Sequence, residues 1–295
     1  MQYQFLGKSD LKVSEVSMGC MSLNPEDPHS LGIIRAAIDS GINFFDTADL
    51  YNKGANEAML GRALRSDRKS HLIATKVGNR WREDGSGWDW VPSMAYIRAA
   101  VDESLKRLQT DYIDLYQLHG GMIGDPIDEI IETFESLKQS GKIRYYGISS
   151  IRPNVIREYA RRSGIVSVMM QYSLLDRRPE EECLGRLSDL SIGVLARGSL
   201  AQGLLVDKPA RSYLVHTEEN VSKAARAVHF VAGETNTAAQ TAIGFVLKHP
   251  AVISAVAGVR TPEQLSQAIP PLDLTDREYG FLKDSVQNMA YTDHR

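Results

Sequence analysis

The chain has 295 residues, of which 43% are hydrophobic and 24% charged, and its formal net charge is −3. This composition is ordinary for a soluble globular protein, and it gives no electrostatic reason to expect nucleic acid or a membrane as a partner. No apolar run approaches the roughly 20 residues that span a bilayer. The first residues lack the order of a secretion signal, and Cys20 and Cys183 lack metal or redox spacing, so we expect a cytoplasmic protein with reduced thiols.

A short hairpin is predicted at the start, because Gln2–Phe5 and Leu11–Val13 flank the turn-forming residues Gly7–Asp10. From Val16 onward, apolar runs typical of buried strands alternate with amphipathic runs typical of helices. The predicted strands are Val16–Cys20, Ile42–Asp46, Leu72–Lys76, Tyr112–Leu118, Ile143–Ser149, Val166–Gln171, Ile192–Ala196 and Val252–Ala257. The predicted helices are Leu31–Asp39, Glu57–Leu64, Tyr96–Leu108, Ile127–Lys138, Val155–Arg161, Glu180–Leu190 and Ala238–Lys248.

This alternation favours one parallel sheet, and eight strands are the number that closes a (β/α)8 TIM barrel. We therefore predict an α/β fold with a single barrel domain over residues 1–295, whose bottom is closed by the N-terminal hairpin. An open, doubly wound sheet is the alternative. Such a sheet usually carries G-x-G-x-x-G after its first strand, whereas this chain has Met-Gly-Cys-Met-Ser at positions 18–22.

Two connections are longer than packing requires. Gly78–Pro92 contains all three tryptophans of the chain, and Leu205–Glu234 is polar and uneven. Long loops at the functional face usually cover a ligand. The sequence leaves open whether the second connection is an ordered clasp over such a ligand.

Four polar residues lie at or just beyond the carboxyl ends of predicted strands: Asp46, Tyr51, Lys76 and His119. The strand ends of a parallel barrel open on one face, so these side chains are expected to converge there. A phenol holds its proton tightly at neutral pH, and an ammonium group beside it stabilises the phenolate. The pattern therefore predicts an enzyme with a tyrosine proton donor. A plain ion pair of Asp46 with Lys76, beside a core histidine, is the structural alternative.

Several motifs in this order resemble those of the aldo-keto reductases, most of all the shorter bacterial members. They cover the full chain: Asp46–Tyr51, Gly61–Leu64, Ala74–Lys76, Ser104–Leu115, Gln117–His119, Gly141–Ser149 and Gln171–Leu175. The resemblance implies NADP-dependent reduction of a carbonyl group in a small-molecule substrate. It gives Tyr51 the role of general acid, Lys76 and Asp46 that of supporting it, and His119 that of positioning the substrate.

The resemblance also implies residues that bind the cofactor. Ser149, Ser150 and Gln171 would hold the nicotinamide amide, although many relatives have asparagine at the position of Ser150. Arg197 would stack on the nicotinamide ring, where many relatives have tyrosine. The residues expected at the pyrophosphate are Gly198, Ser199 and Leu200. Those expected around the adenosine half are Gly258, Val259, Arg260, Gln264 and Gln267, with Arg260 favouring NADPH over NADH.

The substrate wall is expected to include Met21, Trp81, Trp88 and Trp90, which would form an apolar mouth. A metal-dependent hydrolase would need clustered His, Asp and Glu ligands, and only Asp46 and His119 approach such a cluster, so no metal is expected. The main alternative function is an NADPH-binding regulatory or accessory protein with slow or no turnover. The substrate and the oligomeric state stay open at this stage.

Overall fold

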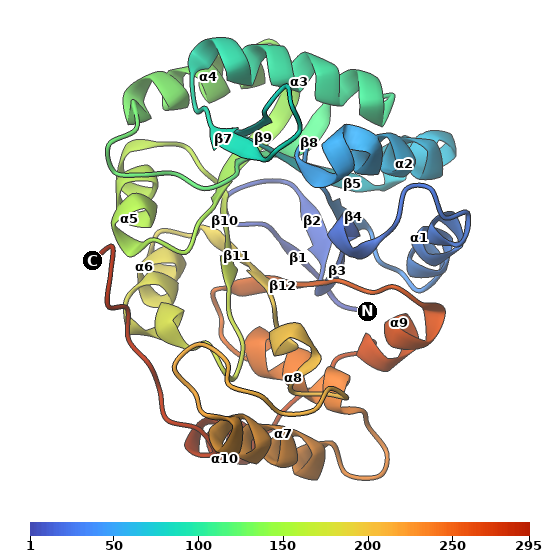
Figure 1. The fold of residues 1–295 in the computed structure, drawn as a ribbon, viewed down its shortest axis with the longest axis vertical. Coiled ribbons are helices and arrows are strands. Elements are labelled where there is room, and N and C mark those ends of the chain that lie inside the picture. Colours follow the sequence, from blue (N-terminus) through green and yellow to red (C-terminus); the bar gives the residue numbers. More distant parts are fainter.

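The computed structural model describes residues 1–295, and its centre is a closed barrel of eight parallel strands (Figure 1). Around the barrel the strands follow one another in chain order, and the last pairs with the first. They are β3 Val16–Gly19, β4 Phe44–Asp46, β5 Leu72–Val77, β8 Ile113–Leu118, β9 Ile143–Ser149, β10 Ser167–Gln171, β11 Gly193–Arg197 and β12 Val252–Ala257. The predicted (β/α)8 TIM barrel is confirmed.

Helices surround the barrel (Figure 1). Their apolar residues are buried in the core that they share with the strands. They are α1 His29–Asp39, α2 Ala55–Leu64, α3 Met94–Leu108, α4 Ile127–Gln139, α5 Pro153–Arg162, α6 Cys183–Asp189, α7 Glu218–Ala232, α8 Ala238–Leu247, α9 Pro262–Ala268 and α10 Asp276–Asp284. Several begin at a side-chain cap; Thr237, for example, forms a reciprocal capping box with Gln240 at the start of α8. None of the ten combines the length and the apolar composition that crossing a bilayer requires.

The two long connections are more ordered than expected. The segment Leu205–Glu234 was predicted as an irregular connection and instead contains α7, a helix of 15 residues. Its signals were a Thr217 cap followed by acidic residues, and small apolar residues at helical spacing that are all buried: Val221, Ala224, Ala227, Val228 and Ala232. The segment Gly78–Pro92 contains an antiparallel hairpin of β6 Asn79–Trp81 and β7 Trp88–Trp90. The chain also forms α10, which the sequence analysis did not predict.

The N-terminal hairpin, β1 Tyr3–Phe5 with β2 Lys12–Ser14, closes the bottom of the barrel. Leu6, Leu11 and Val13 are fully buried against a layer of apolar residues from the barrel strands. Gly7 lies so close to the strands that an added Cβ would be 2.3 Å from the carbonyl oxygen of Val166, and its φ is +56°. Glycine is therefore required at this turn.

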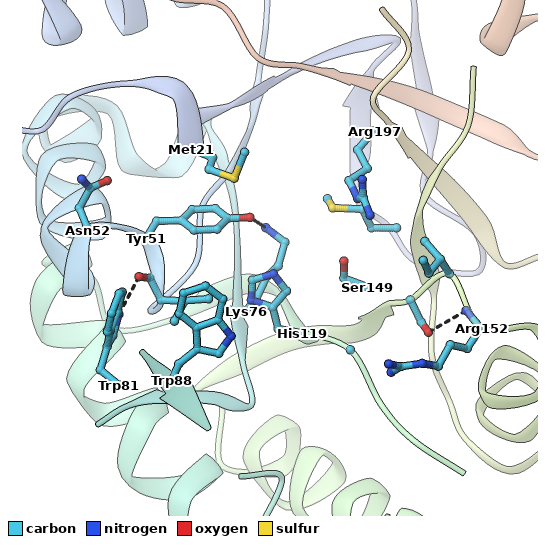
Figure 2. A pocket seen from close by; sticks show the side chains of 15 residues that line it. Met21, Tyr51, Asn52, Lys76, Trp81, Trp88, His119, Ser149, Arg152 and Arg197 are labelled. Carbon is cyan, nitrogen blue, oxygen red and sulfur yellow. Dashed lines mark hydrogen bonds between the residues drawn. The ribbon is translucent and has the colours of Figure 1, made fainter. Parts of the chain in front are cut away.

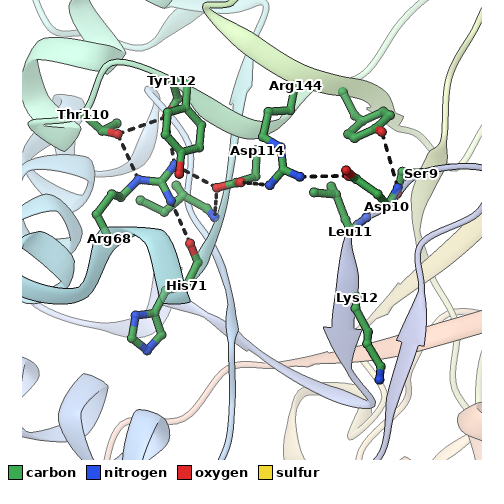
Figure 3. Close-up of polar contacts among 12 residues, drawn as sticks. Ser9, Asp10, Leu11, Lys12, Arg68, His71, Thr110, Tyr112, Asp114 and Arg144 are labelled. Carbon is green, nitrogen blue, oxygen red and sulfur yellow. Dashed lines mark hydrogen bonds and ion pairs between the residues drawn. The ribbon is translucent and has the colours of Figure 1, made fainter.

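A chain of ion pairs ties this hairpin to the barrel (Figure 3). Asp114 on β8 accepts hydrogen bonds from Arg68 and Arg144, each at 2.8 Å, and Arg144 also donates to Asp10 at 2.8 Å. The Asp114 side chain is 1% exposed, so its charge is compensated by two guanidinium groups rather than by water. The network lies among residues at the amino ends of the strands, so we assign it to stability rather than to chemistry.

Candidate active site

The four polar residues predicted to converge do so at the carboxyl end of the barrel. Figure 2 shows three of them, Tyr51, Lys76 and His119. Asp46 is the last residue of β4, Lys76 lies one residue from the end of β5, and His119 directly follows β8. Tyr51 begins a short 3-10 turn, Tyr51–Gly54, which follows β4. Parallel strands in neighbouring positions thus bring together residues that are up to 73 positions apart in sequence, from Asp46 to His119.

Lys76 is the centre of the cluster. Its Nζ donates to Asp46 Oδ1 at 2.5 Å, to the Thr47 carbonyl at 2.7 Å and to the Tyr51 hydroxyl at 3.4 Å. Burial alone would lower the pKa of Lys76, but the Asp46 carboxylate and the Tyr51 hydroxyl outweigh it and hold that pKa above its ordinary value. The ammonium therefore stays charged at neutral pH, in direct contact with the phenol oxygen.

Asp46 is held from its other oxygen as well. Gln117 Nε2 donates to Asp46 Oδ2 at 3.2 Å, and both side chains are buried. Burial raises the pKa of Asp46 above the usual range, and the Lys76 ammonium and the Gln117 amide oppose that rise. Gln117 was predicted only as part of a motif; its signal as a supporting residue is its polarity within an otherwise apolar strand, β8.

His119 is neutral at physiological pH. Burial, together with the nearby charges of Lys76 and Arg197, lowers its pKa to about 3. Its ring stands edge-to-face against Tyr51, with centroids 5.8 Å apart, and its Nδ1 is buried without a hydrogen-bond partner. A neutral imidazole can donate from one nitrogen and accept at the other, so it can orient a bound oxygen without carrying charge.

The turn that carries Tyr51 has an unusual backbone. Asn52, Lys53 and Gly54 have φ values of 50°, 53° and 85°, three successive residues in the left-handed region. Left-handed residues other than glycine are uncommon and cluster at functional sites. Two hydrogen bonds hold the residues on either side of this turn: the Thr47 hydroxyl donates to Asn56 Oδ1 at 2.7 Å, and Asn56 Nδ2 donates to the Cys20 carbonyl at 2.9 Å.

A cavity of about 610 Å³ opens at this end of the barrel, and Tyr51, Lys76 and His119 line it (Figure 2). Of the residues predicted for the site, those that line it are Met21, Tyr51, Lys76, Trp81, Trp88, His119, Ser149, Ser150 and Arg197. Lining residues that the sequence analysis missed are Leu50, Asn52, Gly120, Ile151, Arg152 and Met169. No group of three or more His, Cys, Asp or Glu side chains is arranged to hold a metal ion.

Two of the three tryptophans face this cavity. Trp81 and Trp88 pair across the β6–β7 hairpin with ring centroids 5.5 Å apart, and Trp81 Nε1 donates to the Leu50 carbonyl at 2.9 Å. Trp90 lies outside the cavity lining, since its ring covers Gly78 and its Nε1 donates to Asp125 at 3.0 Å. The structure therefore places Trp90 as an anchor of the hairpin rather than at the cavity.

The residues predicted for the nicotinamide lie at the ends of β9, β10 and β11. Gln171 Nε2 donates to Asp176 Oδ2 at 2.7 Å and to the Tyr213 hydroxyl at 3.2 Å, while Arg197 donates to Gln171 Oε1 at 2.9 Å. These bonds fix the Gln171 amide in one orientation. Asp176 and Tyr213 were missed, and Tyr213 comes from the long segment Leu205–Glu234.

The residues predicted for the rest of the dinucleotide follow β11 and β12. Gly198, Ser199 and Leu200 directly follow β11, and Ser199 Oγ is buried without a partner. Around α9, Thr261 caps the helix, and Gln264 Oε1 accepts from the backbone N–H of exposed Arg260 at 2.9 Å. The remaining residues of this group are Gly258, Val259 and Gln267. A Cβ added at Gly258 would lie 2.9 Å from the Ser22 hydroxyl oxygen, Val259 is buried and Gln267 is exposed.

This side of the barrel fits a nicotinamide dinucleotide in its chemistry. Arg197 and Arg260 are exposed and pair with no carboxylate, as suits phosphate-bearing ligands. The unpartnered hydroxyl of Ser199 is available as a donor, and backbone N–H groups at the start of α9 add to the positive potential. The nicotinamide, pyrophosphate and adenosine subsites would thus follow β9 to β12 in order.

Comparison with known proteins agrees with this geometry. The model of the "Aldo/keto reductase family" matches residues 15–285. The chain is 48% identical to the "Uncharacterized oxidoreductase YqkF" of Bacillus subtilis, with all of both chains covered. It is also 31% identical to the "Probable aldo-keto reductase 1" of Glycine max, covering 90% of this chain and 82% of that one.

Solved structures give the same result. The holo form of "aldo-keto reductase AKR11C1 from Bacillus halodurans" superimposes with a TM-score of 0.95 at 46% identity, covering 100% of this chain and 99% of that one. The "glycerol dehydrogenase AKR11B4 from Gluconobacter oxydans" has a TM-score of 0.86 at 28% identity, with 96% and 94% covered. The likeness therefore extends over the whole barrel.

Proposed function

Because the chain belongs to the aldo/keto reductase family, we propose that it reduces aldehyde or ketone carbonyls to alcohols with NADPH as the hydride donor. One observation carries the proposal: the Tyr51 hydroxyl lies 3.4 Å from the Lys76 ammonium, at the base of the 610 Å³ cavity. That arrangement is suited to delivering a proton to an oxygen atom in the cavity. We further propose a cytoplasmic enzyme, a location that the two free, buried cysteines support.

In the proposed reaction Tyr51 donates its hydroxyl proton to the carbonyl oxygen. Lys76 stabilises the phenolate left on Tyr51, and Asp46 keeps Lys76 charged and directed at it. The reduced nicotinamide, when bound, supplies the hydride to the carbonyl carbon. Neutral His119, whose ring contacts Tyr51, orients the carbonyl oxygen by a hydrogen bond.

The cofactor assignments rest on position and chemistry. Ser149, Ser150 and Gln171 would hold the nicotinamide amide, with the Gln171 amide oriented by Asp176 and Tyr213. Arg197 would supply a guanidinium for the nicotinamide ring. The remaining contacts come from Gly198, Ser199, Leu200, Gly258, Val259, Arg260, Gln264 and Gln267. Met21, Trp81 and Trp88 form the apolar wall on the substrate side of the cavity.

The test is a Tyr51→Phe variant, with NADPH consumption followed optically against a panel of aldehydes and ketones. Loss of the general acid should lower kcat by on the order of 10²–10⁴-fold while NADPH affinity stays within a small factor. Tyr3→Phe is the matched control, because Tyr3 lies on the bottom hairpin and donates only to the Gly41 carbonyl, at 2.7 Å. Turnover of Tyr51→Phe within threefold of wild type would refute the assignment. Tight NADPH binding without turnover of any carbonyl by the wild type would favour the accessory-protein alternative.

A further inference from the structure

Arg152 is a cavity-lining side chain to which the proposed reaction gives no role. It directly precedes α5, its backbone N–H is bonded to Ser150 Oγ at 3.2 Å, and its Nη1 donates to the Gly121 carbonyl at 2.5 Å. It takes part in none of the ion pairs of the chain. A guanidinium has five N–H donors, so four of them have no protein partner here, although the side chain is half-buried.

The position of Arg152 places it with the substrate rather than with the dinucleotide. The nicotinamide, pyrophosphate and adenosine subsites extend from the end of β9 through β10 and β11 to β12. Arg152 follows Ser149 and Ser150 in the connection from β9 to α5, but its guanidinium turns to Gly121, in the connection between β8 and α4 that begins with His119. Figure 2 shows it on the opposite side of His119 from Trp81 and Trp88. A substrate whose carbonyl meets Tyr51 and His119 would therefore extend between the two tryptophans and Arg152.

The charge of the cavity is one-sided. Its lining contains three cations, Lys76, Arg152 and Arg197, and no aspartate or glutamate. Lys76 is compensated by the buried Asp46, and Arg197 lies on the cofactor side. Arg152 is thus the one cation on the substrate side without a carboxylate, beside apolar side chains that strengthen its field by excluding water.

From this we propose that the substrates of the site are carbonyl compounds that carry a carboxylate, and that Arg152 binds that carboxylate. The proposal rests on the proposed function and adds the substrate class to it. A guanidinium matches a carboxylate with two parallel hydrogen bonds, which gives orientation as well as affinity. Trp81 and Trp88 would hold the carbon body of the same substrate.

The experiment compares kcat/KM for matched aldehydes in the full-length protein with NADPH: 3- and 4-carboxybenzaldehyde against 3- and 4-methylbenzaldehyde. We expect the wild type to favour at least one carboxylated isomer by roughly 10–100-fold, the effect of one strong charge-assisted interaction. Arg152→Gln retains a donor for the Gly121 carbonyl but removes the charge, and it should bring that ratio close to one. Arg152→Lys should keep part of it. Arg98→Met, which removes an exposed arginine of α3, controls for net charge and should leave the ratio unchanged.

Added salt should reduce the wild-type ratio and leave that of Arg152→Gln unaffected, because only the former depends on a charge pair. A wild-type ratio within threefold of one, or a ratio that persists in Arg152→Gln, would overturn the proposal. If the methylated aldehydes are reduced without any carboxylate preference, the substrate class is wrong and the proposed function stands.

A binding measurement decides the case in which no aldehyde is turned over. The quenching of tryptophan fluorescence by benzoate, compared with benzyl alcohol, is measured in the protein saturated with NADP. Tighter binding of benzoate that Arg152→Gln abolishes supports the anion site even if reduction is absent. Equal binding of the two compounds refutes it.

Discussion

Two Lys–Asp pairs of this protein have the same length and different surroundings, which allows the active-site pair to be tested against an internal control. Lys76 and Asp46 are 2.5 Å apart with side chains 1% and 5% exposed, whereas Lys142 and Asp102 are also 2.5 Å apart but 38% and 48% exposed. Removing one partner of a buried pair leaves an uncompensated charge and costs about 3–5 kcal/mol. Removing one partner of an exposed pair costs about 0–1 kcal/mol.

We therefore expect Asp46→Asn to lower the free energy of unfolding by about 3–5 kcal/mol and Asp102→Asn by less than about 1 kcal/mol. Both values are measured by urea denaturation, provided that the slope with denaturant stays constant. Asp46 supplies the largest contribution that raises the pKa of Lys76, so its loss lowers that pKa. A Lys whose folded-state pKa is raised contributes stability that is lost as pH rises through that pKa, and the variant should therefore show less of this pH-dependent stability than the wild type.

The kinetic consequence is a second readout of the same substitution. Because Lys76 loses its proton at a lower pH in Asp46→Asn, the decline of kcat at alkaline pH should begin at a lower pH than in the wild type. In addition, weaker support of Tyr51 should lower kcat on the order of 10²-fold. The Asp102→Asn profile should match that of the wild type. Equal destabilisation by the two substitutions, or an unchanged kcat profile for Asp46→Asn, would show that the buried pair does not support the reaction as described.

Further measurements test other parts of the site. The pKa of His119 is lowered from 6.5 to about 3, so on acidification between these values the unfolded state gains a proton before the folded state does. The free energy of unfolding should therefore fall by ~1.4 kcal/mol per pH unit in this range. In His119→Gln the free energy of unfolding should fall less steeply with pH. Arg260→Ala should erase most of an NADPH preference of about one to two powers of ten in Kd, and equal Kd values of the wild type for NADPH and NADH would contradict this. Asp176→Asn should reduce discrimination between NADPH and its 3-acetylpyridine analogue, which lacks the amide N–H proposed to donate to Gln171. Unchanged discrimination would count against the orienting role of Asp176. Trp88→Ala should raise KM for bulky aromatic aldehydes more than for small ones, whereas Trp90→Ala should mainly lower thermal stability; the reverse pattern would contradict the placement of the two rings.

The barrel and the four converging residues, Asp46, Tyr51, Lys76 and His119, could be predicted because local sequence patterns indicate them. Strand bounds were found to within two residues, and those of β9 and β12 without error. The converging residues could be placed because each of Asp46, Lys76 and His119 ends an apolar run, and the parallel topology then determines that they meet.

The rest depends on contacts between distant segments. Asp176 and Tyr213 accept hydrogen bonds from the Gln171 side-chain amide and so determine its orientation. No spacing in the sequence indicates these contacts. The three indoles occupy one connection, and Trp88 and Trp90 project from the same side of β7. Only the packing of the Trp90 ring on Gly78 and its hydrogen bond to Asp125 keep Trp90 out of the cavity lining. Helix α7 was missed because it lies within a connection of polar and uneven composition, although its buried residues fall at helical spacing.

The hairpin that closes the bottom has a consequence for the order in which the protein is made. Gly7 packs on Val166, Ser191 and Gly193, and Asp10 pairs with Arg144, so the hairpin leaves the ribosome well before the later parts of the chain that it contacts. The hairpin cannot reach its final position until about two thirds of the chain, through Gly193, has been synthesised. We expect a nascent chain stalled before β11 to leave this segment open to protease, so a segment translated before the barrel strands would be among the last to become protected.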